Sequence, residues 1–473
     1  MNKRIRQASQ LIFLTLYLVL LYFSARAVVP EDDFPFNLFL RTDPFFTIST
    51  LLSSRVFHYG LLISLVTLLL TLVLGRFYCG WVCPLGSIYD ITGRASVFLH
   101  KIKNSFFPRI GNFLQHKISR TFKYILLIIL LASAALGLNI AGLFDPLSIL
   151  TRTLAISAYK IAGYISPVFT LTAILFILLL IFSTFLSRFW CMKLCPLGAS
   201  LGFTAKFALL GREVKGCTKC GRCKRVCPMH TIDNEFKSKR SECVLCLNCK
   251  ESCKSSAIEF NFSYPKEKES IDISRRRLIA GILAGTALAP FLKVIAGETI
   301  LLRPPGVKEQ KNFMEKCARC GECMRVCPTN VIQPELFQHG LEGLYLPVMA
   351  PRIGYCKYTC NACGKVCPTG AIPKLALKAK QNFCIGTAEF DKNTCLPWSR
   401  DENCDKCFKI CPTKAISLEN AKRNGKQVNL PSVYSGKCIG CGACEYICPL
   451  TGPAAIHVKL RTQVKEVVNN NWE

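Results

Sequence analysis

The fold is decided by one stretch of the sequence, Cys217-Thr218-Lys219-Cys220-Gly221-Arg222-Cys223-Lys224-Arg225-Val226-Cys227-Pro228. This C-x2-C-x2-C-x3-C-P spacing is typical of a run that wraps one 4Fe–4S cluster and gives its fourth thiolate to a neighbouring cluster. A second run follows, and the two together predict a two-cluster ferredoxin. One cluster is expected to take Cys217, Cys220, Cys223 and Cys253, and the other Cys243, Cys246, Cys249 and Cys227.

Four further runs occupy the C-terminal part of the chain, each with a proline after its last cysteine, so the sequence predicts six 4Fe–4S clusters. The sixteen expected ligands are Cys317, Cys320, Cys323 and Cys327; Cys356, Cys360, Cys363 and Cys367; Cys395, Cys404, Cys407 and Cys411; and Cys438, Cys441, Cys444 and Cys448. In the third run we prefer Cys395 to Cys384 as first ligand because it lies closer to Cys404. Cys384 is then expected to be a small buried hydrophobe. Disulfides and structural zinc are poor alternatives, because neither repeats this spacing.

Apolar stretches alternate with these polar runs. The 473 residues are 51% hydrophobic, with a mean hydropathy of +0.30, and 19% charged. Stretches of about 17–25 apolar residues span a bilayer, and four candidates fill the first part of the chain: 11–29, 59–74, 124–140 and 168–185. A fifth, 278–295, follows Ser274-Arg275-Arg276-Arg277, which looks like a twin-arginine export signal within the chain.

The charge distribution predicts the orientation. Lys and Arg number 60 against 30 acidic residues, a formal charge of +30. Basic residues gather at the N-terminus and in the loop 76–123, whereas acids gather in the loop 30–55, so positive-inside counting places the N-terminus in the cytoplasm. The fifth stretch then carries the C-terminal domain into the periplasm. We attribute the basic excess to membrane flanks and anionic clusters, which argues against nucleic-acid binding.

An internal repeat organises the N-terminal region. Each unit has an Asp-Pro pair, an apolar stretch and a C-x3-C-P motif. The motifs supply Cys79, Cys83, Cys191 and Cys195. Two packed units would bring these thiols together, where they form a further iron–sulfur centre, act as redox-active thiols, or bind nothing. Arg76, Arg188 and Lys193 would provide a positive setting, and Trp81 and Trp190 are expected to anchor the membrane interface.

Three polar residues are weaker candidates. Asp43 and Asp145 are expected to be helix N-caps ahead of a first-turn proline, with proton acceptance as the alternative. His58 is the one histidine placed to receive a proton from a quinol, although a solvated side chain is the commoner role. The sequence has no C-x-x-C-H motif and no Gly-rich nucleotide loop, so neither haem nor a nucleotide cofactor is expected.

The expected architecture is multi-domain, an α-helical membrane bundle plus two α+β domains like bacterial ferredoxins. Residues 1–205 form a four-helix transmembrane domain and 206–265 a cytoplasmic two-cluster domain. Residues 266–300 hold the twin-arginine-like segment and a fifth span. Residues 301–473 form a four-cluster domain, expected in the periplasm.

These motifs resemble two protein families. Residues 1–260 look like the NapH-type membrane component of periplasmic nitrate reductase systems, with four spans, two C-x3-C-P motifs and a two-cluster ferredoxin. The membrane regulators of nitrous oxide and organohalide reduction are similar in this core. Residues 274–473 resemble NapG, an exported four-cluster ferredoxin. The chain thus resembles a fusion of the two. The resemblance implies that the outer two runs of the C-terminal domain exchange fourth ligands, and that the inner two do the same.

The resemblance implies a quinol dehydrogenase component, passing electrons from the membrane quinone pool to a periplasmic reductase or carrier. The cluster runs themselves favour electron transfer more firmly than any donor, so a cytoplasmic donor stays open. Two alternatives also remain: a membrane redox sensor or maturation factor for a metalloenzyme, and a cytoplasmic ferredoxin assembly that is only anchored to the membrane. The last alternative requires that residues 278–295 do not cross the membrane.

Overall fold

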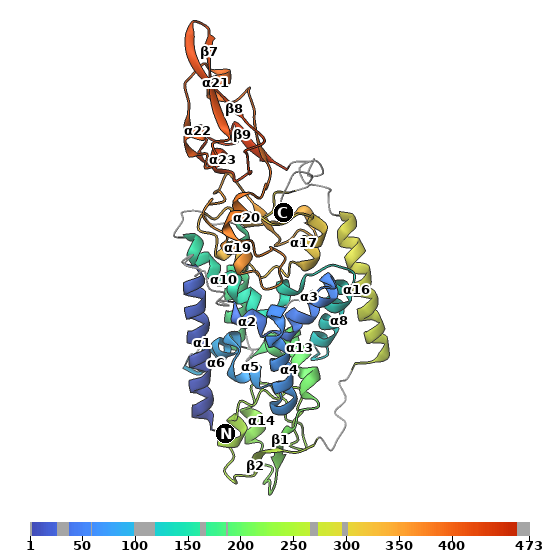
Figure 1. Ribbon diagram of the computed structural model, residues 1–473. Coiled ribbons are helices and arrows are strands. Elements are labelled where there is room, and N and C mark those ends of the chain that lie inside the picture. Colours follow the sequence, from blue (N-terminus) through green and yellow to red (C-terminus); the bar gives the residue numbers. More distant parts are fainter. Residues whose placement is uncertain are drawn as a thin grey trace.

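The computed structural model describes residues 2–25, 37–57, 59–98, 119–160, 167–185, 188–264, 273–295 and 301–460. The molecule is elongated, with a helical region between two cysteine-rich modules that lie at its opposite ends (Figure 1). We call residues 206–264 the proximal module and residues 301–460 the distal module. The N-terminal helix starts beside the proximal module, where Lys3 Nζ lies 2.7 Å from Glu251 Oε2.

The helical region repeats one order of elements. The first half consists of α1 (Lys3–Ala25), α2 (Leu38–Arg41), α3 (Pro44–Ser54), the 3-10 turn η1 (Tyr59–Leu61), α4 (Ile63–Leu74), α5 (Phe77–Trp81) and α6 (Pro84–Phe98). The second consists of α8 (Phe122–Ala135), α9 (Ala141–Phe144), α10 (Pro146–Lys160), α11 (Pro167–Phe185), α12 (Phe189–Lys193) and α13 (Pro196–Ala205). The helices from α2 to α6 and from α9 to α13 therefore follow the same plan, as the sequence repeat predicted.

Proline positions set the starts of these helices. Pro44, Pro84, Pro146 and Pro196 each occupy the first residue of a helix, where the missing N–H is not needed. Asp43 caps α3, with Phe46 N donating to its Oδ1 at 3.0 Å. Asp145 caps α10, with Ser148 N donating to its Oδ2 at 2.7 Å. The predicted N-cap roles of both aspartates are confirmed.

The apolar stretches of the sequence are helical, but several helices are shorter than predicted. One helix among the described residues, Lys3–Ser24, is long and apolar enough to cross a membrane. The stretch at 124–140 ends early, because α8 stops at Ala135 and Gly137 adopts a left-handed φ of +84° that terminates the helix. At 1.5 Å per residue, the 12 residues of α4 cover about 18 Å. His58, our candidate proton acceptor, lies outside the described residues.

Helix α16 (Arg275–Ile295) connects the two ends of the molecule along one side of α8 (Figure 1). Its contact with α8 depends on Gly285, whereas a Cβ at Gly281 would come no closer than 3.4 Å to Ile128. A Cβ at Gly285 would lie 2.5 Å from the Ile129 carbonyl oxygen, so only glycine allows this approach. Small residues four apart are typical of helix pairs in membranes, and the sequence analysis did not use this signal.

The proximal module is a small α+β unit. Strands β1 (Leu210–Val214) and β2 (Ile258–Phe262) pair antiparallel, and helices α14 (Arg222–Arg225) and α15 (Asn248–Glu251) follow the first cysteines of each run. Because the two strands come from the start and the end of the module, they close it around both cysteine runs.

The distal module uses the same kind of elements in greater number. Its helices are α17 (Gln310–Lys316), α18 (Glu322–Arg325), α19 (Ala362–Lys365), α20 (Leu377–Gln381), α21 (Leu396–Ser399), α22 (Lys406–Ile410) and α23 (Ala443–Ile447). Its strands are β3 (Ile332–Pro334), β4 (Gln338–Leu341), β5 (Pro347–Met349), β6 (Thr387–Phe390), β7 (Ile416–Arg423), β8 (Lys426–Val433) and β9 (Ile456–Lys459). The antiparallel pairs are β3–β5, β6–β9 and β7–β8, and the β7–β8 hairpin forms the far tip of the molecule (Figure 1).

Candidate iron–sulfur centres

The proximal module gathers its eight thiols into two groups of four. One cavity of about 320 Å³ is lined by Cys217, Cys220, Cys223 and Cys253. A second of about 300 Å³ is lined by Cys227, Cys243, Cys246 and Cys249. The fourth cysteine of each run thus joins the other run, which is the grouping predicted from the sequence.

The distal module gathers sixteen thiols, but not in the groups that the resemblance implied. One cavity of about 360 Å³ is lined by Cys317, Cys320, Cys323 and Cys367, and another of about 350 Å³ by Cys327, Cys356, Cys360 and Cys363. A third, of about 370 Å³, is lined by Cys395, Cys404, Cys407 and Cys448. The fourth group consists of Cys411, Cys438, Cys441 and Cys444. Cys411 and Cys438 are in electrostatic range of Cys441, and Cys438 and Cys441 are in range of Cys444. Neighbouring runs therefore exchange fourth ligands, first with second and third with fourth.

The expectation that outer runs pair with outer and inner with inner is wrong, and the reason is topological. Strands β3 and β5 lie between the first and second runs and pair antiparallel, which returns the second run beside the first. The β7–β8 hairpin does the same for the third and fourth runs. Contacts between α18 and α19, and between α22 and α23, follow from these two returns.

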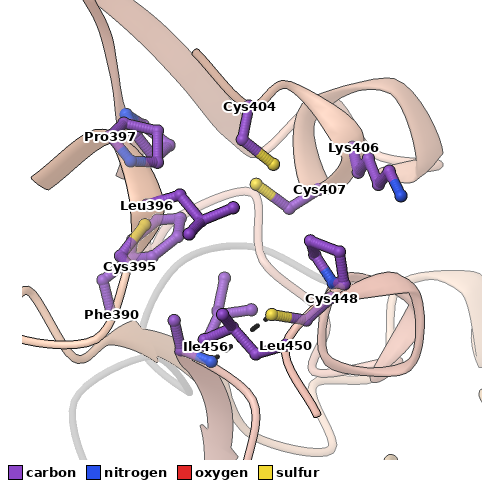
Figure 2. Close-up of a pocket in the computed structure, with 13 residues that line it drawn as sticks. Phe390, Cys395, Leu396, Pro397, Cys404, Lys406, Cys407, Cys448, Leu450 and Ile456 are labelled. Atoms are coloured by element: carbon purple, nitrogen blue, oxygen red, sulfur yellow. Dashed lines mark hydrogen bonds between the residues drawn. The ribbon is translucent and has the colours of Figure 1, made fainter. Parts of the chain in front are cut away.

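The third run takes Cys395 rather than Cys384. The sulfurs of Cys404, Cys407 and Cys448 point into the cavity, and Cys395 lies on its opposite wall (Figure 2). Cys384 does not line this cavity. It is exposed, and its Sγ lies 3.3 Å from the Gly386 carbonyl oxygen, so the expectation that it is a buried hydrophobe is wrong.

The thiol groups fit an iron–sulfur cluster by their surroundings. Backbone N–H groups donate to several of the sulfurs at 3.2–3.4 Å, including Ile372 N to Cys367, Ala415 N to Cys411 and Ala455 N to Cys448. Such bonds stabilise the charge on a cluster thiolate and tune its potential. Within the described residues, no His, Cys, Asp or Glu group converges on a single metal ion. The thiols instead surround cavities, as a multi-atom cluster requires.

Burial also makes these thiols harder to deprotonate. It raises the pKa of Cys317 to about 11 and that of Cys243 to about 12. Such thiols hold their protons until a metal binds, so cluster binding at these sites displaces protons and is coupled to folding.

A threonine hydroxyl accompanies most of the fourth cysteines. The hydroxyls of Thr329, Thr369 and Thr413 lie 3.6–3.7 Å from the sulfurs of the cysteines two residues earlier. The hydroxyl of Thr231, four residues after Cys227, lies 3.6 Å from the Cys227 sulfur. The sequence signal was the repeated Cys-Pro-Thr, which the sequence analysis did not use.

The C-x3-C-P motifs bring four more thiols together inside the helical region. Cys79, Cys83, Cys191 and Cys195 are all buried, and each of Cys83 and Cys195 lies within electrostatic range of other members of the group. Gly198 N donates to Cys195 Sγ at 3.2 Å. The two repeats therefore meet at their motifs, as the sequence analysis expected.

Buried cations surround this group. Arg76 Nη2 lies 4.0 Å from Cys79 Sγ, and its Nη1 lies 3.0 Å from Glu242 Oε2 of the proximal module. Arg188 lies 2.8 Å from Asp90 and donates to the Cys79 carbonyl oxygen at 3.3 Å. The lysine in electrostatic range of Cys191 is Lys123, not the predicted Lys193. The positive setting predicted for these thiols is therefore present through Arg76 and Arg188.

The proximal module contacts the first motif directly. A Cβ at Gly80 would lie 2.0 Å from the Val244 carbonyl oxygen, between two expected ligands of the proximal module. Trp81 donates its indole N–H to the Leu245 carbonyl oxygen at 3.2 Å. Trp81 therefore lies against the proximal module, a contact the expected role at the membrane interface did not foresee.

The distal module contacts the opposite end of the helical region in a matching way. A Cβ at Gly142, in α9, would lie 2.0 Å from the Ala318 carbonyl oxygen, next to Cys317. Arg325 donates to Ser24 Oγ at 2.7 Å, and Arg152 lies 4.4 Å from the Tyr345 ring centre. Each module thus presents a cysteine loop to the helical region, and nothing in the sequence indicated either contact.

Comparison with known proteins agrees with this geometry. The family model "4Fe-4S binding domain" matches residues 56–105 and 168–215, which hold the two C-x3-C-P motifs, and another of that description matches 217–231. "4Fe-4S dicluster domain" models match residues 239–331, 316–372 and 400–452. The range 316–372 encloses the first two distal runs, which exchange ligands in the structure, and 400–452 encloses the other two except for Cys395.

Curated relatives cover part of the chain. The methylamine utilization ferredoxin-type protein MauM of Methylorubrum extorquens is 35% identical over 39% of this chain and 88% of its own length. The ferredoxin-type protein NapG of Escherichia coli is 33% identical over 38% of this chain and 79% of its own. The chain belongs to the NapG/MauM family of ferredoxin-type proteins. No solved structure matches it.

Membership of the NapG/MauM family gives the thiol groups their chemistry. The protein is a ferredoxin-type iron–sulfur electron-transfer protein that carries multiple 4Fe–4S clusters. Iron supplies one-electron chemistry when the clusters are bound. The four cysteines of each group would hold a cluster, and backbone N–H groups would donate to several of their sulfurs. Cys317 and Cys323 are buried, whereas Cys217 and Cys220 are exposed.

Proposed function

We propose that this protein is a membrane-bound conduit that passes electrons from quinol, or from a cytoplasmic donor, to a periplasmic respiratory reductase. In this proposal its first half acts as a NapH-like membrane component and its second half as a NapG-like ferredoxin. The observation that carries the proposal is the position of the two modules. They lie at opposite ends of the helical region, and each touches it with a cysteine loop.

The surface of the helical region supports a membrane location. Exposed apolar side chains follow α4 and α11, including Val66 and Leu69 on the first and Leu175 and Leu178 on the second. Helices α1 and α16 present similar faces. Large exposed apolar surfaces mark membrane or protein contact, and four helices with such faces around one region favour lipid. We therefore propose a multi-pass membrane domain with its N-terminus in the cytoplasm.

The thiol groups form a series along the molecule. The cavity of Cys243 and Cys246 adjoins the C-x3-C-P thiols through the contact at Gly80. At the other end, the group of Cys317 faces the helical region through Ala318. Within the distal module, Cys356 N donates to the Cys441 carbonyl oxygen at 2.8 Å, which joins the first pair of groups to the second. We propose six 4Fe–4S clusters in this series and a further iron–sulfur centre at the C-x3-C-P thiols.

The location of the C-terminus tests the route. We would fuse a periplasm-active reporter after Glu473 and, in a second strain, a cytoplasm-active reporter at the same point. The proposal expects activity from the periplasmic reporter alone. Activity from the cytoplasmic reporter alone would exclude a transmembrane route and leave a ferredoxin assembly on the inner face.

Iron content tests the number of centres. Six 4Fe–4S clusters correspond to about 24 iron atoms in each chain, and a further centre at the C-x3-C-P thiols adds to that number. Replacing Cys79 and Cys191 together by Ser should lower the iron content without loss of the ferredoxin signals. An unchanged iron content in that variant would leave these four thiols without an iron–sulfur role.

A further inference from the structure

Two buried carboxyl groups lie in electrostatic range of one another inside the helical region. Asp43 and Asp145 come from equivalent positions of the two repeats, and neither has any exposed surface. One oxygen of each accepts hydrogen bonds at a helix N-terminus, from Phe46 N to Asp43 and from Ser148 N and Oγ to Asp145. Capping therefore accounts for one oxygen of each carboxyl group.

Capping does not account for the remaining oxygens. Asp43 Oδ2 and Asp145 Oδ1 are buried, and no donor from the rest of the described chain reaches either of them. Asp145 is the acidic group in electrostatic range of Asp43, so the two carboxyl groups face the same buried site. Ionised carboxylates only accept hydrogen bonds, so their free oxygens can satisfy one another only if one group carries a proton. Two adjacent carboxylates cannot both ionise in a buried site.

The neighbouring charges do not neutralise the pair. No described Lys or Arg forms an ion pair with either carboxyl group. Arg152 is the cation in electrostatic range on α10, but it donates to the Ser148 carbonyl oxygen and stacks on Tyr345. Glu322 and Arg325 of α18 are ion-paired to each other. Since no described cation pairs with them, the two carboxyl groups can reduce their combined negative charge by binding a proton.

Hydroxyl groups extend from the pair toward both modules. Tyr78, next to Cys79, lies 2.9 Å from the hydroxyl of Thr42, which precedes Asp43. On the other side, Tyr17 lies 3.0 Å from the hydroxyl of Thr151, and both Tyr17 and Tyr78 are in electrostatic range of Asp145. The pair thus lies between the C-x3-C-P thiols and the distal module.

We propose that Asp43 and Asp145 form a buried carboxylic acid–carboxylate pair that shares one proton and is the proton-binding site of the helical region. When an electron reaches the adjacent centres, the pair gains a second proton from water and becomes two carboxylic acids. When the electron leaves, that proton is released. This coupling rests on the proposed electron-transfer function, whereas the shared proton in the resting protein does not.

Infrared difference spectroscopy of the holoprotein tests the pair. We would record spectra before and after reduction by dithionite, in H2O and in D2O, for the parent protein, Asp43→Asn and Asp145→Asn. Asn is as good an N-cap as Asp, so each variant keeps the helix start and loses only the titratable group. Asp233→Asn is the matched control, because Asp233 is an exposed carboxyl group whose side chain accepts from Lys237 N.

The expected result is a carbonyl band of a protonated carboxyl group that changes on reduction and shifts in D2O. It should be present in the parent and in Asp233→Asn and absent in both pair variants. Proton uptake on reduction should fall by one per molecule in the pair variants. If one variant fails to fold, the other still decides, since loss of either carboxyl group removes the shared proton.

Two outcomes would overturn the proposal. A band that persists unchanged in both pair variants would place the proton elsewhere. A parent protein in which no protonated carboxyl band changes on reduction would mean that the pair takes up no proton. Paramagnetic resonance of the same samples reports whether electrons reach the distal clusters. Failure of that transfer with the band intact would therefore count against the proposed function and not against the proton site.

Discussion

Removing the charge of Glu242 should destabilise the junction between the proximal module and the helical region. Glu242 is buried and is, among the described residues, the carboxylate that pairs with both Arg76 and Lys123. Its Oε2 lies 3.0 Å from Arg76 Nη1 and also accepts from Lys123 Nζ, while Tyr124 donates to Oε1 at 3.0 Å. The variant Glu242→Gln keeps the shape of the side chain and leaves two buried cations without a counter-charge.

The expected cost is large because the pair is buried. Breaking a buried ion pair by removing one partner costs about 3–5 kcal/mol, since the remaining charge stays desolvated. The matched control is Glu235→Gln, because Glu235 pairs with Lys237 at 3.4 Å with both side chains more than half exposed. Exposed pairs of this kind contribute about 0–1 kcal/mol.

The assay is denaturant unfolding of the purified holoprotein, followed by cluster absorbance and by the fluorescence of the helical region. Lys123→Met adds a second test. It removes one of the two cations that Glu242→Gln leaves without a partner. The double variant Glu242→Gln/Lys123→Met should therefore lose less stability than the two single variants lose when their losses are added. If Glu242→Gln unfolds at the same denaturant concentration as Glu235→Gln, the buried network does not hold the junction and the reasoning fails.

Three further predictions concern single positions. Cys395→Ser should lower the iron content and abolish one cluster signal, whereas Cys384→Ser should leave both unchanged; equal losses would contradict the assignment of the third run. Gly142→Ala should loosen the distal module by about 1–3 kcal/mol in thermal unfolding, because its Cβ meets the Ala318 carbonyl oxygen at 2.0 Å. The control is Gly93→Ala in α6, where the added Cβ would have no atom within 4 Å, and this variant should be neutral or stabilising. Thr369→Val should lower the potential of the cluster held by Cys367 in a redox titration, by about 40 mV if the lost hydroxyl contact favours the reduced cluster by about 1 kcal/mol; an unchanged potential would show that the hydroxyl is not oriented toward the sulfur.

The sequence predicted the parts of the site that depend on local spacing. A C-x2-C-x2-C run fixes three thiols around one cavity through a few backbone dihedrals, so the first three members of each such run could be assigned without a structure. The N-cap roles of Asp43 and Asp145 followed from the proline after each. The repeat predicted that the four C-x3-C-P thiols would meet, because equivalent helices in two copies bury equivalent faces.

The sequence did not predict what depends on the path of the chain between runs. The ligand exchange in the distal module is set by β3–β5 and by the β7–β8 hairpin, and strand pairing over such distances leaves no mark on cysteine spacing. The contacts at Gly80 and Gly142 were missed for a different reason. Each glycine lies in a helix of four or five residues, and the sequence does not show which carbonyl oxygen packs against it.

These two glycines connect the internal repeat to the proposed electron route. Gly80 lies inside the first C-x3-C-P motif, and Gly142 lies just before the second Asp-Pro pair, so they come from different parts of the repeated unit. Each unit has one end that carries thiols and another that carries a capping aspartate. Because both units run in the same order and meet at their motifs, all four thiols lie toward the proximal module, and the paired carboxyl groups lie between them and the distal module. A tandem repeat thereby gives the helical region two chemically different ends, as the proposed conduit between two different ferredoxin modules requires.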